Sequence, residues 1–150
     1  MFRHVKYEYR PRDFAAAEAE GRSLALYLGI LNRIRAEHPA LGQLRNIRFH
    51  YSDDDAVLIY SKHLEGRFID GRAADDHDTV IVVANVDPHS VRETSVHLDL
   101  AAIGLEPGSR YVVEDLVTGT RWDWGPSNYV RLDAFTRPAH ILHVIRGTHV

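Results

Sequence analysis

The sequence contains no cysteine, which excludes disulfide bridges and thiolate metal sites. It also has no basic excess, because 18 Lys and Arg are spread among 21 Asp and Glu. Sequence-independent binding of nucleic acid needs clustered phosphate contacts, so we expect no nucleic-acid partner. No apolar run approaches the roughly 18 residues that span a bilayer, so we expect no membrane partner either. The length and these absences are typical of a cytoplasmic protein with one domain and a short appendage.

Residues 22–37 have the periodicity of an amphipathic helix. Five residues form its apolar face: Leu24, Tyr27, Leu28, Leu31 and Ile34. Ser23 is a suitable N-cap, and Pro39 ends the helix at or before the preceding residue. An earlier start near Asp13 is also compatible with the alanine-rich composition, although Gly21 favours a break between the two segments.

After residue 46 the pattern changes to short segments rich in β-branched and aromatic residues, separated by turn signals. We predict strands near 46–51, 56–63, 79–86, 92–99, 109–116, 119–124, 128–132 and 139–146. The segment 79–86 is apolar on both faces, which predicts a central strand. About eight strands at this spacing indicate an antiparallel β-sandwich of Greek-key type, preceded by the helix. We therefore predict two parts, residues 1–44 and residues 45–150.

The ten histidines do not have the spacing of a metal site. His140 and His143 are three residues apart on a predicted strand, so they point to opposite faces. The run Asp53–Asp55 resembles the start of a calcium loop, but Leu58 stands where that loop requires glycine. A solvated turn fits these aspartates better. We predict no metal site and no cofactor.

Three aromatic residues, Trp122, Trp124 and Tyr129, allow two interpretations. Aromatic rings stack on sugar faces, so the three could form a carbohydrate-binding surface. Alternate residues of a strand share a face, so Trp122 and Trp124 could equally face the core. We favour the core position.

Several segments resemble a known family. Leu31–Leu41 resembles the last helix of the α-amylase-type (glycoside hydrolase family 13) barrel, and Val82–Asp87 and Tyr111–Gly119 resemble the β-sandwich that follows that barrel. Lys6–Phe14 and Asn128–Asp133 with Pro138–Ile141 are similar to the bacterial maltosyltransferases that extend α-1,4-glucan from maltose 1-phosphate.

The resemblance implies a parent enzyme of bacterial glycogen or α-glucan biosynthesis that uses two carboxylates in a retaining mechanism. In the family these carboxylates lie on barrel strands upstream of the last helix, so no catalytic residue is expected here. Lys6 and Tyr7 match a Lys–Tyr pair that contacts the maltosyl unit in the family. The resemblance therefore implies a substrate-binding role for both residues when the barrel is present.

Our first hypothesis is a non-catalytic C-terminal domain that supports the catalytic barrel of such an enzyme, with residues 1–44 as the end of the barrel. A free-standing carbohydrate-binding module and an inactive truncated gene product are the alternatives. Leu26 and Ile30 widen the apolar face of the helix beyond one contact. We expect residues 22–37 to bind the missing barrel or to self-associate.

Overall fold

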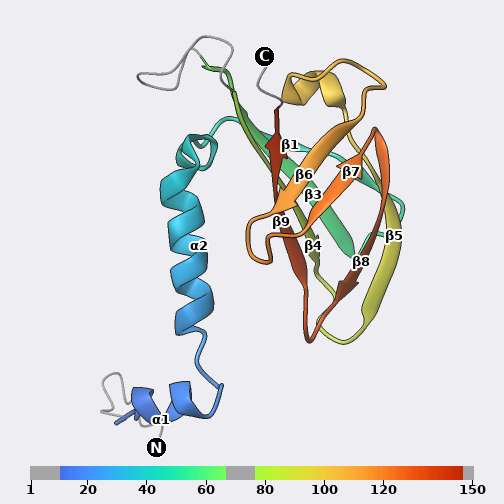
Figure 1. Cartoon of the computed structure of the whole chain (residues 1–150). Helices are drawn as coiled ribbons and strands as arrows, with labels where there is room; N and C mark the ends of the chain where they lie inside the picture. The colour runs from blue at the N-terminus through green and yellow to red at the C-terminus, as the bar shows by residue number, and fades with distance from the viewer. Residues whose placement is uncertain (1–10, 67–76, 147–150) are drawn as a thin grey trace, which may run out of the picture. The chain divides into compact units, whose positions relative to one another are not determined.

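The computed structural model describes residues 11–66 and 77–146 (Figure 1). The chain divides into two compact units, residues 1–33 and residues 34–150. The first unit contains α1 (Phe14–Ala19) and most of α2 (Ala25–Glu37). Within the described residues, no helix has both the length and the hydropathy needed to cross a membrane.

Capping residues separate the two helices where the sequence predicted a break. The Asp13 carboxylate accepts a hydrogen bond from the Ala16 N–H at 2.9 Å and begins α1. Gly21 has a φ of 69°, a left-handed conformation in which glycine has no Cβ penalty. The Ser23 hydroxyl then accepts from the Ala25 N–H at the start of α2. The predicted helix over 22–37 is confirmed, and Pro39 begins the short 3₁₀ helix η1 (Pro39–Gly42) directly after it.

The second unit is an antiparallel β-sandwich, as predicted. Its larger sheet has the strand order β1-β3-β4-β9-β6-β7. These six strands are β1 (Ile47–Phe49), β3 (Val57–Leu64), β4 (Asp78–Asn85), β9 (Ala139–Ile145), β6 (Tyr111–Asp115) and β7 (Arg121–Trp124). The smaller sheet has the order β2-β5-β8, with β2 (Tyr51–Ser52), β5 (Val91–His97) and β8 (Ser127–Asp133). The chain changes sheet between β1 and β2, β2 and β3, β4 and β5, β5 and β6, β7 and β8, and β8 and β9.

One predicted strand is divided in the structure. Within the predicted strand 46–51, residues 47–49 form β1 in the larger sheet, and Tyr51 already belongs to β2 in the smaller sheet. Phe49 pairs with Tyr60 of β3, whereas Tyr51 pairs with His97 of β5. The prediction of a single strand was wrong, because the sequence of a short apolar run does not show where the chain leaves one sheet for the other.

Strand β4 is central, as its doubly apolar sequence predicted. It pairs with β3 on one side and β9 on the other (Figure 1). Ile81 and Val83 belong to the core between the sheets, and Val80 is also buried on the opposite face. Val82 and Ala84 on that opposite face are only half buried, so both faces are covered only in the first half of the strand.

The core between the sheets is one apolar cluster to which both sheets contribute. Its buried members are Val57, Ile59, Ile81, Val83, Val96, Leu98, Leu100, Ile103, Tyr111, Val113, Trp124, Val130, Leu132, Leu142 and Val144. Leu100 and Ile103 come from a further 3₁₀ helix, η3 (Leu100–Ile103), which closes one end of the sandwich. Burying such side chains provides most of the driving force for this fold.

Candidate functional site

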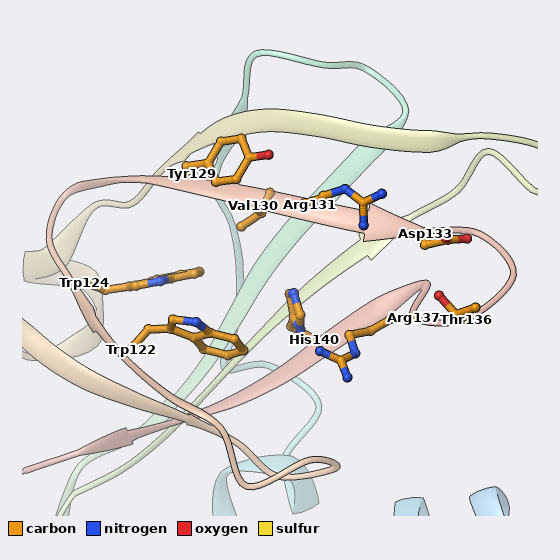
Figure 2. Close-up of a pocket in the computed structure, with 9 residues that line it drawn as sticks. All are labelled: Trp122, Trp124, Tyr129, Val130, Arg131, Asp133, Thr136, Arg137 and His140. Atoms are coloured by element: carbon orange, nitrogen blue, oxygen red, sulfur yellow. The ribbon is translucent and has the colours of Figure 1, made fainter.

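A cleft of about 400 Å³ opens where the edge strands of the two sheets meet (Figure 2). Strand β7 is the last strand of the larger sheet and β8 is the last strand of the smaller one. The cleft is lined by Trp122, Trp124, Tyr129, Val130, Arg131, Asp133, Thr136, Arg137 and His140. Aromatic rings beside arginine side chains form a surface suited to a flat, hydroxyl-rich ligand.

A tight turn between β7 and β8 positions the aromatic residues of the cleft. The Asn128 side chain accepts a hydrogen bond from the Gly125 N–H at 2.8 Å and donates one to the Gly125 carbonyl at 2.7 Å. Along β8, Val130 points into the core while Tyr129 and Arg131 point outward. Tyr129 is 63% exposed, so its ring is available to a ligand.

A buried histidine–aspartate pair lies next to Trp122, and its histidine, His140, also lines the cleft. The Nδ1 atom of His140 is 2.9 Å from Oδ2 of Asp115, and both side chains are buried. The other carboxylate oxygen accepts from the Val117 N–H at 2.9 Å. Burial disfavours the charged carboxylate, but the hydrogen bonds from His140 and Val117 outweigh it and lower the pKa of Asp115. The His140 ring also meets Trp122 edge-on, with centroids 5.2 Å apart.

The two tryptophans have different environments. Trp124 is buried in the core cluster, as we favoured from the sequence. Trp122 is half buried and packs against the same cluster while it lines the cleft. The core interpretation therefore holds for Trp124 and in part for Trp122, and the carbohydrate-binding surface stays a prediction.

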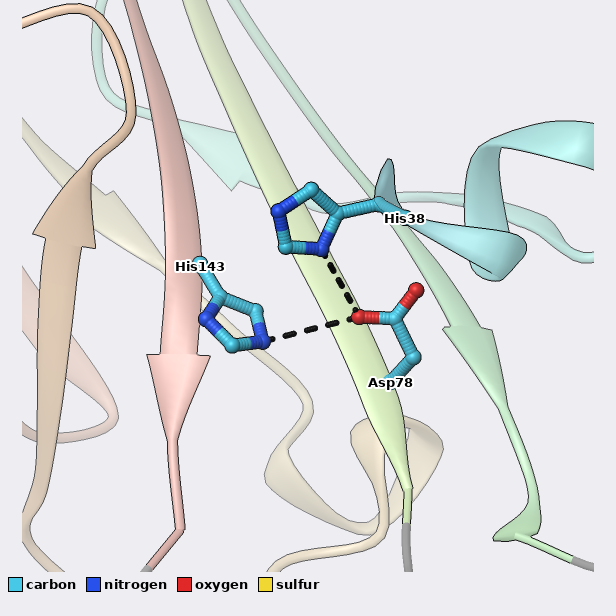
Figure 3. Close-up of side chains that lie close together, drawn as sticks. All are labelled: His38, Asp78 and His143. Carbon is cyan, nitrogen blue, oxygen red and sulfur yellow. Dashed lines mark hydrogen bonds and ion pairs between the residues drawn. The ribbon is translucent and has the colours of Figure 1, made fainter. Parts of the chain in front are cut away.

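A second group of side chains comes together at the opening residue of β4 (Figure 3). Oδ1 of Asp78 is 3.0 Å from Nδ1 of His38 and 3.5 Å from Nε2 of His143. Oδ2 of Asp78 accepts a hydrogen bond from the Ala40 N–H at 2.8 Å. The three ligand-type atoms of His38, Asp78 and His143 all lie within 4.8 Å of one another.

The charge on Asp78 is favoured by these partners. Burial raises the pKa of its carboxyl group, but hydrogen bonds from His143, His38 and the Ala40 N–H have the larger effect and lower it well below its usual range. The two imidazole rings of His38 and His143 lie with centroids 4.6 Å apart. Asp78 is thus an ionised, buried acceptor between two histidines.

A neighbouring group contains His63, Glu65 and His77. His63 Nδ1 bonds the Thr79 hydroxyl at 2.7 Å, and its Nε2 lies 3.4 Å from Glu65. The His63 and His77 rings are stacked at 5.3 Å. Burial is the main cause that lowers the pKa of His63.

The prediction that His140 and His143 point to opposite faces of their strand is confirmed, but the spacing argument overlooked a histidine pair that the fold brings together. His140 and His143 bond different aspartates, Asp115 and Asp78, as expected for residues on opposite faces of β9. The sequence reasoning considered only histidines close along the chain. It missed His38, which is more than a hundred residues before His143 and reaches it through the fold.

The aspartates at 53–55 serve a turn, as the sequence indicated. Oδ1 of Asp54 accepts from the Ala56 N–H at 2.8 Å, and its Oδ2 is 3.4 Å from Arg92. Asp53 bonds His97 at 2.9 Å. The two predicted substrate-binding residues, Lys6 and Tyr7, lie outside the described residues.

The fold defines a class, which is the two-sheet antiparallel β-sandwich domain. Residues 49–144 match the family described as GLGE, C-terminal, and the chain belongs to this family. The resemblance seen in the sequence is thereby confirmed.

Curated relatives are similar over nearly the whole chain. An alpha-1,4-glucan:maltose-1-phosphate maltosyltransferase of Corynebacterium glutamicum is 47% identical over 136 residues, which is 91% of this chain and 19% of the relative. Maltosyltransferase 2 of Streptomyces coelicolor is 43% identical over 94% of this chain and 19% of its own length. The enzyme of Mycolicibacterium smegmatis is 46% identical over 93% of this chain and 19% of the relative. The chain spans about a fifth of the length of these relatives.

Proposed function

We propose that this chain is the non-catalytic C-terminal domain of an α-glucan maltosyltransferase and that it supports the catalytic barrel of that enzyme. In this proposal residues 1–44 are the end of the barrel and residues 45–150 are the sandwich. The parent would extend α-1,4-glucan from maltose 1-phosphate in the bacterial cytoplasm. The family match over residues 49–144, within relatives five times longer, carries the proposal.

The chemistry of the cleft agrees with a non-catalytic role. Retaining transfer of a glycosyl group needs two carboxyl groups about 5 Å apart. Among the described residues that line the cleft, Asp133 is the one carboxylate, and its Oδ1 accepts from the Phe135 N–H at 2.9 Å. Asp115, behind the cleft, is bound to His140 and Val117.

A chimera tests the structural role. The matching C-terminal region of the Corynebacterium glutamicum enzyme is replaced by this chain, and phosphate release from maltose 1-phosphate is followed. We expect an active chimera. Val83→Asp, which places a charge in the core, should lower its melting temperature and its kcat together, because fewer molecules keep an intact barrel.

The KM for maltose 1-phosphate should stay unchanged in that variant. An isolated chain that releases phosphate above the blank would contradict the non-catalytic assignment. A Val83→Asp chimera that melts and turns over like its parent would contradict the supporting role.

The apolar face of α2 supports an interaction with the barrel. Within this helix Ile34 is the buried residue, whereas Leu26 is 75% exposed and Leu28 is also exposed, as is Leu24 just before the helix. We propose that residues 22–37 contact the barrel and that the isolated chain self-associates through them. Leu26→Lys with Ile30→Lys should make the isolated chain more monomeric in sedimentation without a loss of sheet structure. A monomer for the unmodified chain at about 100 μM, where interfaces of ~5.5 kcal/mol are half formed, would refute this.

The cleft supports a second candidate function, which is binding of α-glucan by the sandwich itself. Tyr129 and Trp122 offer ring faces and Arg131 and Arg137 offer donors to sugar hydroxyls. Tyr129→Ala should abolish retardation of the chain in glycogen-containing native gels. Tyr51→Ala, at an exposed tyrosine outside the cleft, is the matched control. Equal mobility of both variants and the parent would exclude glucan binding at this cleft.

A further inference from the structure

The group at the start of β4 has the donor set and the spacing of a transition-metal site. We propose that His38, Asp78 and His143 bind a divalent zinc-type cation through Nδ1, Oδ1 and Nε2. Imidazole nitrogen and carboxylate oxygen are ordinary zinc ligands, and three protein ligands with a water complete a tetrahedral site. The proposal does not depend on the maltosyltransferase assignment.

The distances fit this coordination. Atoms bound to zinc at 2.0–2.2 Å in a tetrahedron are roughly 3.3–3.6 Å apart. The 3.5 Å from Oδ1 of Asp78 to the His143 nitrogen falls in that range, and the 3.0 Å to the His38 nitrogen is slightly shorter. The His38 and His143 nitrogens lie within 4.8 Å of each other. A small rotation of the half-buried His143 side chain would bring all three atoms to one cation.

The hydrogen bonds leave the metal-binding atoms available. Within residues 11–66 and 77–146, Nδ1 of His38 and Nε2 of His143 have no hydrogen-bond partner other than Oδ1 of Asp78. A bound cation would take the place of the contacts that the His38 and His143 nitrogens make with Oδ1 of Asp78. Oδ2 of Asp78 keeps its hydrogen bond from Ala40, which orients the carboxylate in the way that outer partners orient metal ligands.

A second cleft, of about 270 Å³, gives the cation an entry path. Glu37, His77 and Arg146 line it together with the three proposed ligands. The Arg146 guanidinium is held by the Thr79 hydroxyl at 2.9 Å and by the carbonyls of Ile103 and Gly104 at 2.6 and 3.1 Å. These bonds hold the guanidinium against Thr79 and η3, and its charge acts on both Asp78 and Glu65. The cleft has room for the water that would be the fourth ligand.

The neighbouring histidine group fits a metal less well. His63 uses Nδ1 for the Thr79 hydroxyl, to which Arg146 also donates. A cation bound beside His63 would therefore lie close to the Arg146 charge, which already contributes to the lowered pKa of His63. Glu65 is more exposed than Asp78 and would lose more water on binding. The site at Asp78 is the favoured one.

The test is titration of the chelator-treated full chain with Zn²⁺ and with Co²⁺ at pH 7.5. We expect one ion per chain by calorimetry and the d–d absorption of four-coordinate cobalt. At a Zn²⁺ concentration of 100 times Kd, the melting temperature should rise by about 5–10 °C. At pH 5.5 binding should be lost, because the imidazoles must give up a proton to bind the ion.

Variants assign the site. His143→Gln should weaken binding at least 10-fold, and its metal-free melting temperature should stay within a few degrees of the parent's, since this side chain is 30% exposed. His97→Gln removes a surface histidine that also bonds an aspartate, and it should bind zinc normally. His77→Gln should bind normally too. No saturable binding up to 1 mM, unchanged binding by His143→Gln, or loss of binding in His77→Gln would each overturn the proposal.

Discussion

Two buried aspartates, Asp115 and Asp78, each contact histidine side chains, and the surroundings of the two groups differ. Asp115 and His140 form a closed pair, with Trp122 packed against the imidazole and the Val117 N–H on the second carboxylate oxygen. Asp78 shares one oxygen between His38 and His143 beside a cleft. The same residue types therefore form a structural pair in one place and a candidate ligand site in the other. The Asp78 group differs in having a second imidazole and a cleft that opens to solvent.

Removal of the closed pair should have the largest effect. Asp115→Ala leaves the His140 imidazole and the Val117 N–H without their acceptor in a buried place. We expect a loss of about 3–5 kcal/mol in the free energy of unfolding, measured by urea denaturation. Asp123→Ala removes an exposed ion pair with Arg110 and should cost less than about 1 kcal/mol. Equal losses in the two variants would show that the closed pair is not structural.

Acid should weaken both groups together. The pKa values of Asp115 and Asp78 are lowered in the folded protein. The unfolded chain therefore takes up protons first, at about pH 4, and the stabilisation present above that pH is lost as the pH falls further. Thermal melts between pH 7 and pH 3 should show this decline. Asp115→Asn and Asp78→Asn should each make the decline shallower, and an unchanged slope in both would contradict the role of these carboxylates.

Neutral replacement of the shared carboxylate, Asp78, should cost less stability than deletion of the Asp115 carboxylate. Asp78→Asn can keep the hydrogen bond from the Ala40 N–H but loses the charge that faces the two histidines. We expect a loss of about 1–2 kcal/mol in the free energy of unfolding. Asp99→Asn, at an exposed partner of Arg48, is the control and should change stability little. A loss as large as that of Asp115→Ala would remove the distinction between the groups.

Substitution of the outer histidine should have the smallest effect on stability. His143→Gln changes a partly exposed side chain, so we expect less than about 1 kcal/mol. His140→Gln, three residues earlier on the same strand, should cost about 2 kcal/mol because its ring is buried against Trp122. The two variants compare the two faces of β9 directly. A larger loss of stability in His143→Gln than in His140→Gln would contradict the expected difference.

Most of the fold could be predicted from the sequence because its signals are local. The helix over 22–37 ends at Pro39, and the apolar segment 79–86 is the central strand. The alternation along β8 places Tyr129 and Arg131 outward. The division of residues 46–51 between two sheets could not be predicted, because a strand of three residues is too short for its sequence to indicate which sheet it joins.

The candidate sites were predicted less completely. Trp122, Trp124 and Tyr129 were recognised from the sequence, although the half-buried state of Trp122 depends on how β7 packs. His143 was considered and dismissed as a metal ligand because no second ligand is near in the chain. His38 and Asp78 approach it only after η1 and β4 are packed together.

The sequence by itself determined the family and the alternation of apolar and polar residues that makes a two-sheet sandwich, because these depend on neighbours along the chain. The tertiary structure decided which histidines meet which aspartates. Antiparallel pairing of β4 with β9 sets Val80 opposite His143, and the hydrogen bond from the Ala40 N–H holds η1 against Asp78. Contacts of this kind join residues far apart in the sequence, so only the packing of the strands can bring them within bonding distance.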